Sequence, residues 1–565
     1  MNGRGTVMIL VVTLCGAVLS PAFGHSAEVR ERMMVRNLAP VRLDDSVRPV
    51  VARDVAPGSA IFDYSEGPVG YGWPLISAGP GGMPYNIAML DSSGYLLSRS
   101  CIRTGNWPVW DSAIDVGGTG DQPTFETHNI ASSPASNKVC ITWVRTDTSP
   151  MPGYYRISSD GGASWDSVEQ LDWPAAYGAD TATSFHVSSL YPFYDSDDRL
   201  NVVAAVHPMV QDTGFIMPAG IWHWCPDNNP SWKLIRRAGC DPGHLAAPVG
   251  YNALYACRPS GCCITGDFLL IAWEQFDSAN VDPQTNLLRA GIHVCAFEDG
   301  GAYLETLRIT EPGPYSCRFP VMATYPSEFD STFVLYEVDQ VAGFSPIGQG
   351  PCTDNPVLCR QLCFPMHIAL GDLDTIGGTT YDLQTCGPTR PMTREAGGYG
   401  VHAVWMRSAD TTGAFPDLNV RYNYYEYPSH AWVFTDPPDF MASGQNVFSH
   451  SAGLGCIDVD RATGVAVVSA CTPPPLPHVS VEEGSKSQAP GLKPTATIVH
   501  GVLNLQSAIY NRQSEVALLD VSGRKVLDLE PGANDVSQLT PGVYFVKAVG
   551  EGSSTAYVHK VAVLR

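Results

Sequence analysis

The chain has 565 residues, with 54 glycines, 45 prolines and only 16% charged residues. Glycine and proline both interrupt helices, so this composition argues against long helices and for many short strands joined by turns. The formal net charge of −22 argues against nucleic acid and anionic membranes as partners.

The N-terminus is typical of a secretory signal peptide. Arg4 precedes an apolar run at 7–19, and small residues stand before His25. This run is shorter than the roughly 20 residues that span a bilayer. We therefore expect a signal peptide at 1–24 and an N-terminal extension at 25–60. We also expect a mature chain that has no membrane span and is secreted, or carried to the cell surface, through the periplasm.

A repeat covers the range 61–471. Each copy has a short apolar strand, often ending in an aromatic residue, then a polar loop and a further strand. Such units cannot bury a face alone, but arranged radially they bury one continuous core. We predict an all-β protein in which 61–471 form a β-propeller. The equivalent strand positions, 62 to 69 residues apart, are Trp143, Ala205, Trp273, Tyr336, Trp405 and Val468.

The number of blades depends on the N-terminal part of the repeat region. The last unit ends soon after Ala470 and lacks outer strands of its own. If strands from about 70–100 complete that unit, the propeller has six blades, and this is the arrangement that we favour. If 70–115 form a complete blade themselves, it has seven.

One hairpin carries a recognisable motif. The stretch 157–168 contains Ser-x-Asp-x-Gly-x-x-Trp and resembles the Asp box of the sialidase-like, BNR-repeat propellers. Decayed copies stand at the matching places of the next two units. The residues are Ser158, Asp160, Gly162 and Trp165 in the full motif, Asp227 and Trp232 in the second copy, and Asp299 and Gly301 in the third.

The residue types of the motif suit a structural role. An aspartate accepts hydrogen bonds from backbone N–H groups of its own turn, glycine adopts positive φ, and a tryptophan ring closes a small apolar cluster. In the family that the motif resembles, Asp boxes lie on the face away from the active site. We therefore expect these residues to fasten the fold.

Two other groups of residues were considered as sites. The cluster Asp195, Asp197 and Asp198 has the carboxylates of a calcium site, although a solvated acidic turn is the favoured interpretation. Sialidases clamp a carboxylate with three arginines and use a tyrosine nucleophile. Only Arg318, in "CRFP", approaches their arginine motif, and it lies in the middle of the propeller. We expect no catalytic residue, metal or cofactor.

The chain has 16 cysteines. In an exported protein, cysteines usually form disulfides, because the compartment is oxidising. In the loop with Cys352, Cys359, Cys363 and His367 we favour disulfides over a zinc site. We predict a disulfide between Cys456 and Cys471, because these two cysteines bracket a short hairpin.

The C-terminal part reads as a separate module. A linker at 472–494, rich in proline and serine, precedes alternating strands at 495–565 that predict a small immunoglobulin-like β-sandwich. The module resembles a type IX secretion system (Por) C-terminal sorting domain. That resemblance implies a bacterium of the Bacteroidetes type and the type IX machinery as partner. The matching motifs contain Gly523, Arg524, Pro541, Gly542 and Lys560.

Three functions remain open from the sequence. The leading hypothesis is a non-catalytic propeller that binds an unknown glycan or protein ligand through its long loops. The second is a sialidase-like glycoside hydrolase on the same scaffold. The third is a structural component of the cell envelope. Propellers host many unrelated functions, so the fold does not choose among them.

Overall fold

The computed structural model divides into two compact units, Met1–His478 and Val479–Arg565. Each is described by itself. The described residues are 48–55, 62–65, 72–80, 84–90, 96–104, 107–117, 128–145, 152–171, 184–210, 213–264, 268–298, 303–325, 331–364, 367–384, 390–395, 400–436, 438–448, 451–461, 464–472, 497–500, 502–505, 515–519, 524–529, 532–536, 538–539, 542–549 and 556–564.

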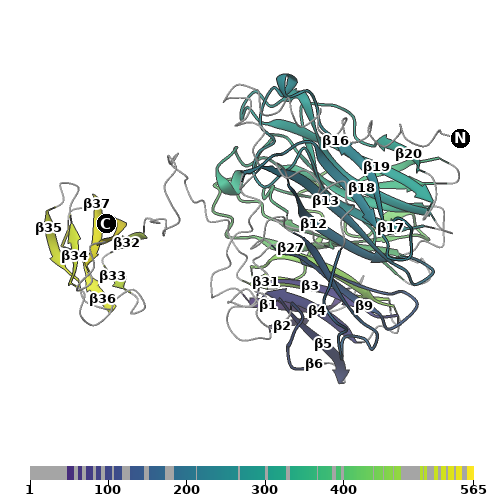
Figure 1. The fold of residues 1–565 in the computed structure, drawn as a ribbon, viewed down its shortest axis with the longest axis horizontal. Helices are drawn as coiled ribbons and strands as arrows, with labels where there is room; N and C mark the ends of the chain where they lie inside the picture. The colour runs from purple at the N-terminus through teal and green to yellow at the C-terminus, as the bar shows by residue number, and fades with distance from the viewer. Residues whose placement is uncertain are drawn as a thin grey trace, which may run out of the picture. The chain divides into compact units, whose positions relative to one another are not determined.

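The first unit is a β-propeller of seven antiparallel sheets, here called blades 1 to 7. Figure 1 shows the strands of one blade, such as β3 to β6, running side by side. Blade 1 contains β3 (Gly72–Ala78), β4 (Tyr85–Leu90), β5 (Leu96–Thr104), β6 (Trp107–Trp110) and β7 (Ile114–Asp115); blade 2 contains β8 (Asn129–Ser132), β9 (Val139–Val144), β10 (Gly153–Ser158) and β11 (Glu169–Gln170); blade 3 contains β12 (Ser184–Tyr194), β13 (Leu200–Val210), β14 (Thr213–Gly214), β15 (Ala219–Trp224) and β16 (Trp232–Ala238).

The remaining blades repeat this order. Blade 4 contains β17 (Ala256–Cys263), β18 (Phe268–Val281), β19 (Leu288–Glu298) and β20 (Tyr303–Arg308); blade 5 contains β21 (Ser316–Met322), β22 (Ser331–Asp339), β23 (Asn355–Cys363) and β24 (Ala369–Thr379); blade 6 contains β25 (Met392–Arg394), β26 (Gly400–Arg407), β27 (Asn419–Glu426), β28 (Ala431–Trp432) and β29 (Gln445–Asn446); blade 7 contains β30 (Gly453–Asp460), β31 (Val465–Thr472), β1 (Arg48–Val55) and β2 (Phe62–Ser65).

The all-β propeller is confirmed, and its described sheets correspond to the seven-bladed alternative. The six predicted repeat strands are the second strands of blades 2 to 7. The range 72–115 forms a blade of its own, so it does not complete the last unit. Blade 7 instead takes its outer strands from β1 and β2, with Val50 opposite Ala470. The prediction of an extension at 25–60 is therefore wrong for 48–55, which belong to the propeller.

The blades close into a ring through their first strands. Neighbouring first strands contact one another in chain order, from β3 through β8, β12, β17, β21 and β25 to β30, and β30 contacts β3. The core is made of apolar clusters between adjacent sheets. One of them joins blades 3 and 4 and encloses Trp273, which has no exposed surface.

The antiparallel order gives the propeller two faces. Loops after the first and third strands of a blade open at one face, and loops after the second and fourth strands open at the other. We call them the Asp160 face, because the hairpin between β10 and β11 lies there, and the Glu337 face, because β22 runs towards it.

Several first strands bulge near the Glu337 face. The register shifts in β3, β12, β17, β21 and β30. In three of these bulges a non-glycine residue has positive φ: Arg258 at 51°, Phe319 at 57° and Leu454 at 56°. A bulge changes the direction in which side chains point, and bulges are common next to active sites. Non-glycine residues with positive φ cost free energy and are also found preferentially at functional sites.

The second unit holds two sheets. The larger has the order β32 (Thr497–His500), β38 (Ala556–Leu564), β37 (Gly542–Val549), β34 (Glu515–Leu519) and β35 (Lys525–Asp528), and the smaller pairs β33 (Val502–Leu505) with β36 (Gly532–Asp535). Within the described part of the chain, no helix has the length and apolar character needed to cross a membrane. The predicted signal peptide lies outside the described residues.

Candidate functional site

Two glutamates occupy equivalent places in neighbouring blades. Glu274 follows Trp273 in β18, and Glu337 follows Tyr336 in β22, so each stands in the second strand one residue after the aromatic repeat position. Both side chains are buried, at 0% and 1% exposure. Each acid lies where a second strand approaches the Glu337 face, beside a first-strand bulge.

Glu274 is held by two arginines. It forms ion pairs with Arg258 of β17 and with Arg318 of β21, the latter at 3.1 Å. The backbone N–H of Phe319 donates to its other carboxylate oxygen at 3.0 Å. Burial by itself raises the pKa of Glu274, but the two arginines outweigh it and lower that pKa to about 2. The carboxylate is therefore ionised, and it ties blade 4 to blade 5.

Arg318 is enclosed by aromatic rings. Its guanidinium carbon lies 5.0 Å from the ring centre of Phe276, 5.5 Å from that of Phe319 and 4.8 Å from that of Phe344. Such cation–π contacts add to the ion pair with Glu274. Arg318, the arginine nearest to the sialidase motif, is thus bound to the buried carboxylate of Glu274.

Three further carboxyl groups gather beside Arg318. Glu337 and Asp339 lie on β22, and Asp382 lies on the connection between β24 and β25; their exposures are 1%, 1% and 3%. Asp382 accepts hydrogen bonds from the backbone N–H of Ser345, at 2.9 Å and 3.0 Å, and from its hydroxyl at 3.2 Å. It thereby joins this connection to the loop that follows β22.

The pKa of each of these three acids is raised above its usual value. Burial, and then the nearby Asp382 and Asp339, raise the pKa of Glu337 well above its usual range. Burial raises the pKa of Asp382 to about 7, and burial together with Asp382 raises the pKa of Asp339. A carboxyl group donates a hydrogen bond only while it is protonated, and a raised pKa widens the pH range over which it can do so.

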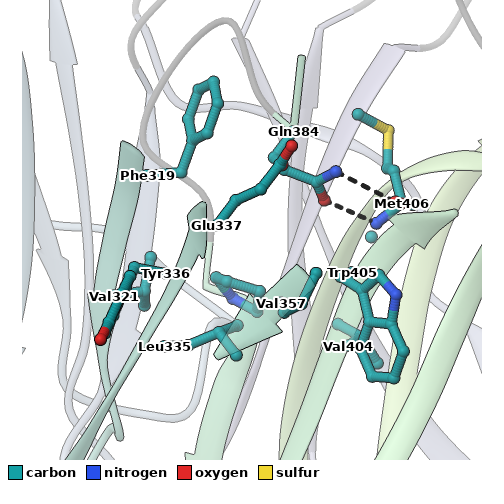
Figure 2. A pocket seen from close by; sticks show the side chains of 12 residues that line it. Phe319, Val321, Leu335, Tyr336, Glu337, Val357, Gln384, Val404, Trp405 and Met406 are labelled. Atoms are coloured by element: carbon teal, nitrogen blue, oxygen red, sulfur yellow. Dashed lines mark hydrogen bonds between the residues drawn. The ribbon is translucent and has the colours of Figure 1, made fainter. Parts of the chain in front are cut away.

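A pocket lies against Glu337, between blades 5 and 6. Figure 2 shows Glu337 and Gln384 close together, with Leu335, Val404 and Trp405 in the apolar part. The amide of Gln384 donates to the carbonyls of Tyr381 at 2.8 Å and Met406 at 3.0 Å, and accepts from the N–H of Met406 at 2.8 Å. The lining residues are Phe319, Val321, Leu335, Tyr336, Glu337, Val357, Gln384, Pro391, Val404, Trp405, Met406 and Gly455.

Glu337 has one carboxyl oxygen without a partner in this pocket. Its Oε1 accepts from the amide of Asn355 at 3.3 Å, while Oε2 is buried and has no hydrogen-bond partner. An apolar pocket with a few polar groups and a carboxyl of shifted pKa is the usual form of a ligand site. This pocket is our candidate functional site.

The motif around Asp160 forms a hairpin tip between the third and fourth strands of blade 2. Asp160 is exposed and accepts from the backbone N–H of Ser164 at 2.8 Å and from its hydroxyl at 2.6 Å. Ser158 is fully buried, and its hydroxyl accepts from the N–H of Gly162 at 2.7 Å. Ser158, more than Asp160, is the buried centre of this turn.

The same tip packs against blade 1. Gly162 has φ of +94°, and a Cβ at this position would lie 2.0 Å from Oδ1 of Asn86 on β4. Trp165 is partly buried and packs against the apolar cluster that includes β4 residues. These contacts fasten neighbouring blades on the Asp160 face.

Of the two decayed copies of the motif, the structure describes the one in blade 3. Asp227 lies in the turn between β15 and β16, which is the matching connection of blade 3, and Trp232 begins β16 with 5% exposure. Asp299 and Gly301 lie outside the described residues.

The acidic turn at 195–198 is engaged with cations and hydroxyl groups. Asp195 accepts from Nε of Arg199 at 3.0 Å, and Asp198 pairs with Lys138 at 2.8 Å. Asp197 lies 3.6 Å from Arg199. Among the residues that the structure describes, no group of three or more metal-ligating side chains is placed to hold a metal ion.

The predicted disulfide between Cys456 and Cys471 is not formed. Both are thiols, and the bulge in β30 shifts the register so that Cys471 faces Gly453 while Cys456 faces Ser469. The thiol of Cys456 points to the carbonyl of Ile76 in blade 1, at 3.7 Å.

The disulfides favoured for the cysteine-rich loop are likewise not formed. Cys352, Cys359 and Cys363 are thiols in this structure. The last two lie within β23, where Cys359 is opposite Leu335 and Cys363 is opposite Ser331. Regular pairing in this strand therefore places no second cysteine across from either.

The predicted sorting motif is partly described. Arg524 precedes β35, Gly542 begins β37, and Lys560 lies in β38 opposite Phe545. Gly523 and Pro541 lie outside the described residues.

Comparison with known proteins gives matches only among solved structures. No protein-family model and no curated protein matches the chain. Similar structures include the α-L-arabinofuranosidase Arb93A of Fusarium graminearum, at 10% identity and a TM-score of 0.37, covering 68% of this chain and 99% of that one. The periplasmic gluconolactonase PpgL of Pseudomonas aeruginosa has 10% identity and a TM-score of 0.36, covering 71% and 98%. A fungal lectin, the Aleuria aurantia lectin, described as a six-bladed propeller, has 11% identity and a TM-score of 0.29, covering 59% and 97%.

Proposed function

We propose that this protein is an exported β-propeller that acts as a non-catalytic binding module, taking a glycan or protein ligand on its Glu337 face. One observation carries the proposal. Around Glu274 the described charged groups bind one another, as Arg258 and Arg318 do with Glu274, while in the pocket beside Glu337 the carboxyl oxygen Oε2 is buried without a hydrogen-bond partner. A face built this way offers a ligand apolar contact and a hydrogen bond.

The motif at Ser158 to Trp165 supports the same orientation. Its place between the third and fourth strands of a blade, on the face opposite Glu337, agrees with the sialidase-like, BNR-repeat resemblance. In that family the Asp boxes lie away from the active site. A ligand site on the Glu337 face is consistent with this arrangement.

A binding assay tests the proposal through one variant on each face. We expect glycan-array screening of the purified full chain to find a ligand. We expect Glu337→Leu to weaken that binding at least tenfold, because it removes the unsatisfied carboxyl from the pocket. Asp160→Ala is the matched control: it removes an exposed turn-forming carboxylate, lowers the melting temperature slightly and leaves affinity within twofold. Loss of affinity in Asp160→Ala with an unchanged melting temperature would contradict the assignment of the two faces.

A glycoside hydrolase is the second candidate. Its supporting observation is the pKa of Glu337, which burial raises above the usual range, as expected for a general acid. The binding proposal expects no release of aryl groups from aryl glycosides or of sialic acid from sialosides. Release well above the buffer rate that is lost in Glu337→Gln would favour the hydrolase.

We further propose that the signal peptide at 1–24 and the module at 495–565 are export signals, the second read by a type IX secretion system. The proposal is supported by the resemblance of 495–565 to the sorting domain, in the motifs that contain Gly523, Arg524, Pro541, Gly542 and Lys560, and by the separation of the chain into two compact units. We expect deletion of 495–565 to leave a folded propeller in the periplasm of a host with this system. A reporter fused to the module should reach the surface. Normal surface delivery of the truncated chain would contradict this role.

A further inference from the structure

We propose that the pocket beside Glu337 binds the neutral hydroxyl group of a small apolar-bodied moiety, such as a hydroxymethyl group of a ligand, with the Glu337 carboxyl as hydrogen-bond donor. The inference rests on the proposed function and specifies the chemistry of the same site.

The size of the pocket limits what enters it. Its cavity volume is about 30 Å³. One water needs roughly 10–15 Å³ of such a cavity, so this pocket accepts about two heavy atoms. The bulk of a ligand therefore remains outside, and only a terminal group reaches Glu337.

The lining decides the polarity of that group. Leu335, Val357 and Val404 offer only apolar contact, and the amide of Gln384 is already bound to the backbone of Met406. The polar atom that is left is Oε2 of Glu337. An ammonium group has three donors and no acceptor, so it cannot accept a hydrogen bond from the protonated Glu337 carboxyl, whereas the oxygen of a hydroxyl group can.

The charges around Glu337 keep it neutral. Arg318 stands opposite it in the ladder between β21 and β22, but this arginine is ion-paired with Glu274. Asp339 on the same strand and Asp382 on the connection to blade 6 are both acidic and disfavour a further negative charge. From the neighbouring strands β23 and β26, the groups that approach are Asn355 and the lining residues of β26, which are uncharged.

Saturation-transfer NMR with matched two-carbon probes tests the proposal on the full chain. The probes are ethanol, ethylamine and acetate at equal concentration, at pH 6. We expect transfer to the methyl group of ethanol, at least fivefold weaker transfer to ethylamine, and none to acetate. In Glu337→Leu the ethanol signal should fall at least fivefold, while Glu337→Gln, whose amide also donates, should retain it.

The pH dependence supplies a second readout. The ethanol signal of the natural chain should decrease as the pH is raised from 6 to 10, because the carboxylate cannot donate, and that of Glu337→Gln should stay constant. Glu298→Gln, at an exposed glutamate of β19, is the control for removing a negative charge. Transfer to ethylamine at pH 6 as strong as transfer to ethanol, or an ethanol signal unchanged in Glu337→Leu, would overturn the proposal. If these probes fail while Glu337→Leu still weakens glycan binding, the proposed function stands and only the ligand chemistry is wrong.

Discussion

Replacing Glu274 by alanine is expected to lower the free energy of unfolding of the propeller by about 3–5 kcal/mol. The carboxylate is fully buried and pairs with both Arg258 and Arg318. Alanine would leave two guanidinium groups largely out of water without their counter-charge. Chemical denaturation followed by tryptophan fluorescence measures this change. All 12 tryptophans precede residue 479, so the signal reports on the propeller alone.

A double variant separates lost charge pairing from lost packing. In Glu274→Leu combined with Arg318→Met, one charge of each sign is removed, and apolar side chains of similar size fill the space. Apolar replacement of a buried ion pair is often close to neutral in stability. We expect the double variant to be more stable than Glu274→Ala by at least about 2 kcal/mol. If Glu274→Ala lowers the free energy of unfolding by less than about 1 kcal/mol, the ion pairs of Glu274 contribute little to stability.

Glu337→Gln is expected to stabilise the propeller increasingly as the pH rises. The folded pKa of Glu337 is raised above its ordinary value, so folding requires a bound proton that the unfolded chain releases above its own pKa. The stability of the natural chain therefore falls with pH in this range, by about 1.4 kcal/mol per pH unit for this group while the folded state stays protonated. Glutamine has no proton to lose and escapes this penalty.

The measurement is the difference in unfolding free energy between the natural chain and Glu337→Gln at pH 5, 6, 7 and 8. Contributions from other titrating groups, such as Asp382, are largely shared by both proteins and cancel in the difference. Glu298→Gln, which changes an exposed glutamate, should show no such trend. A difference that stays constant from pH 5 to pH 8 would mean that Glu337 is ionised in the folded protein.

The repeat could be predicted because second strands are apolar runs with a bulky residue at one position. Trp143, Trp273 and Trp405 mark it most clearly. Blade 1 is harder to recognise in the sequence, because its second strand, 85–90, ends in methionine and leucine and not in an aromatic residue. The pairing of β1 with β31 could not be predicted from local pattern, because each strand alone is compatible with many partners.

The candidate site was missed for a related reason. Glu274 and Glu337 are single acids inside apolar strands, and they belong to no loop or family motif. A signal was present: both follow the aromatic repeat residue of consecutive units, and a carboxylate in an apolar strand requires a partner. Arg258 and Arg318 come from other strands and Asp382 from the connection between β24 and β25, so only the folded arrangement identifies these neighbours. The disulfide prediction failed because a bulge in β30 changed the register.

Blade 7 combines strands from opposite ends of the propeller sequence, and this sets an order for its biogenesis. Val50 pairs with Ala470, so the closing sheet cannot form until some 420 residues of intervening chain exist. At a synthesis rate of about 5–20 residues per second, the N-terminal strand waits roughly 20–80 seconds for its partner. During that interval the edge of β1 that later pairs with β31 has unpaired backbone groups and is open to association with other strands. A chaperone that holds this segment, or export before folding, would protect the chain until the ring closes.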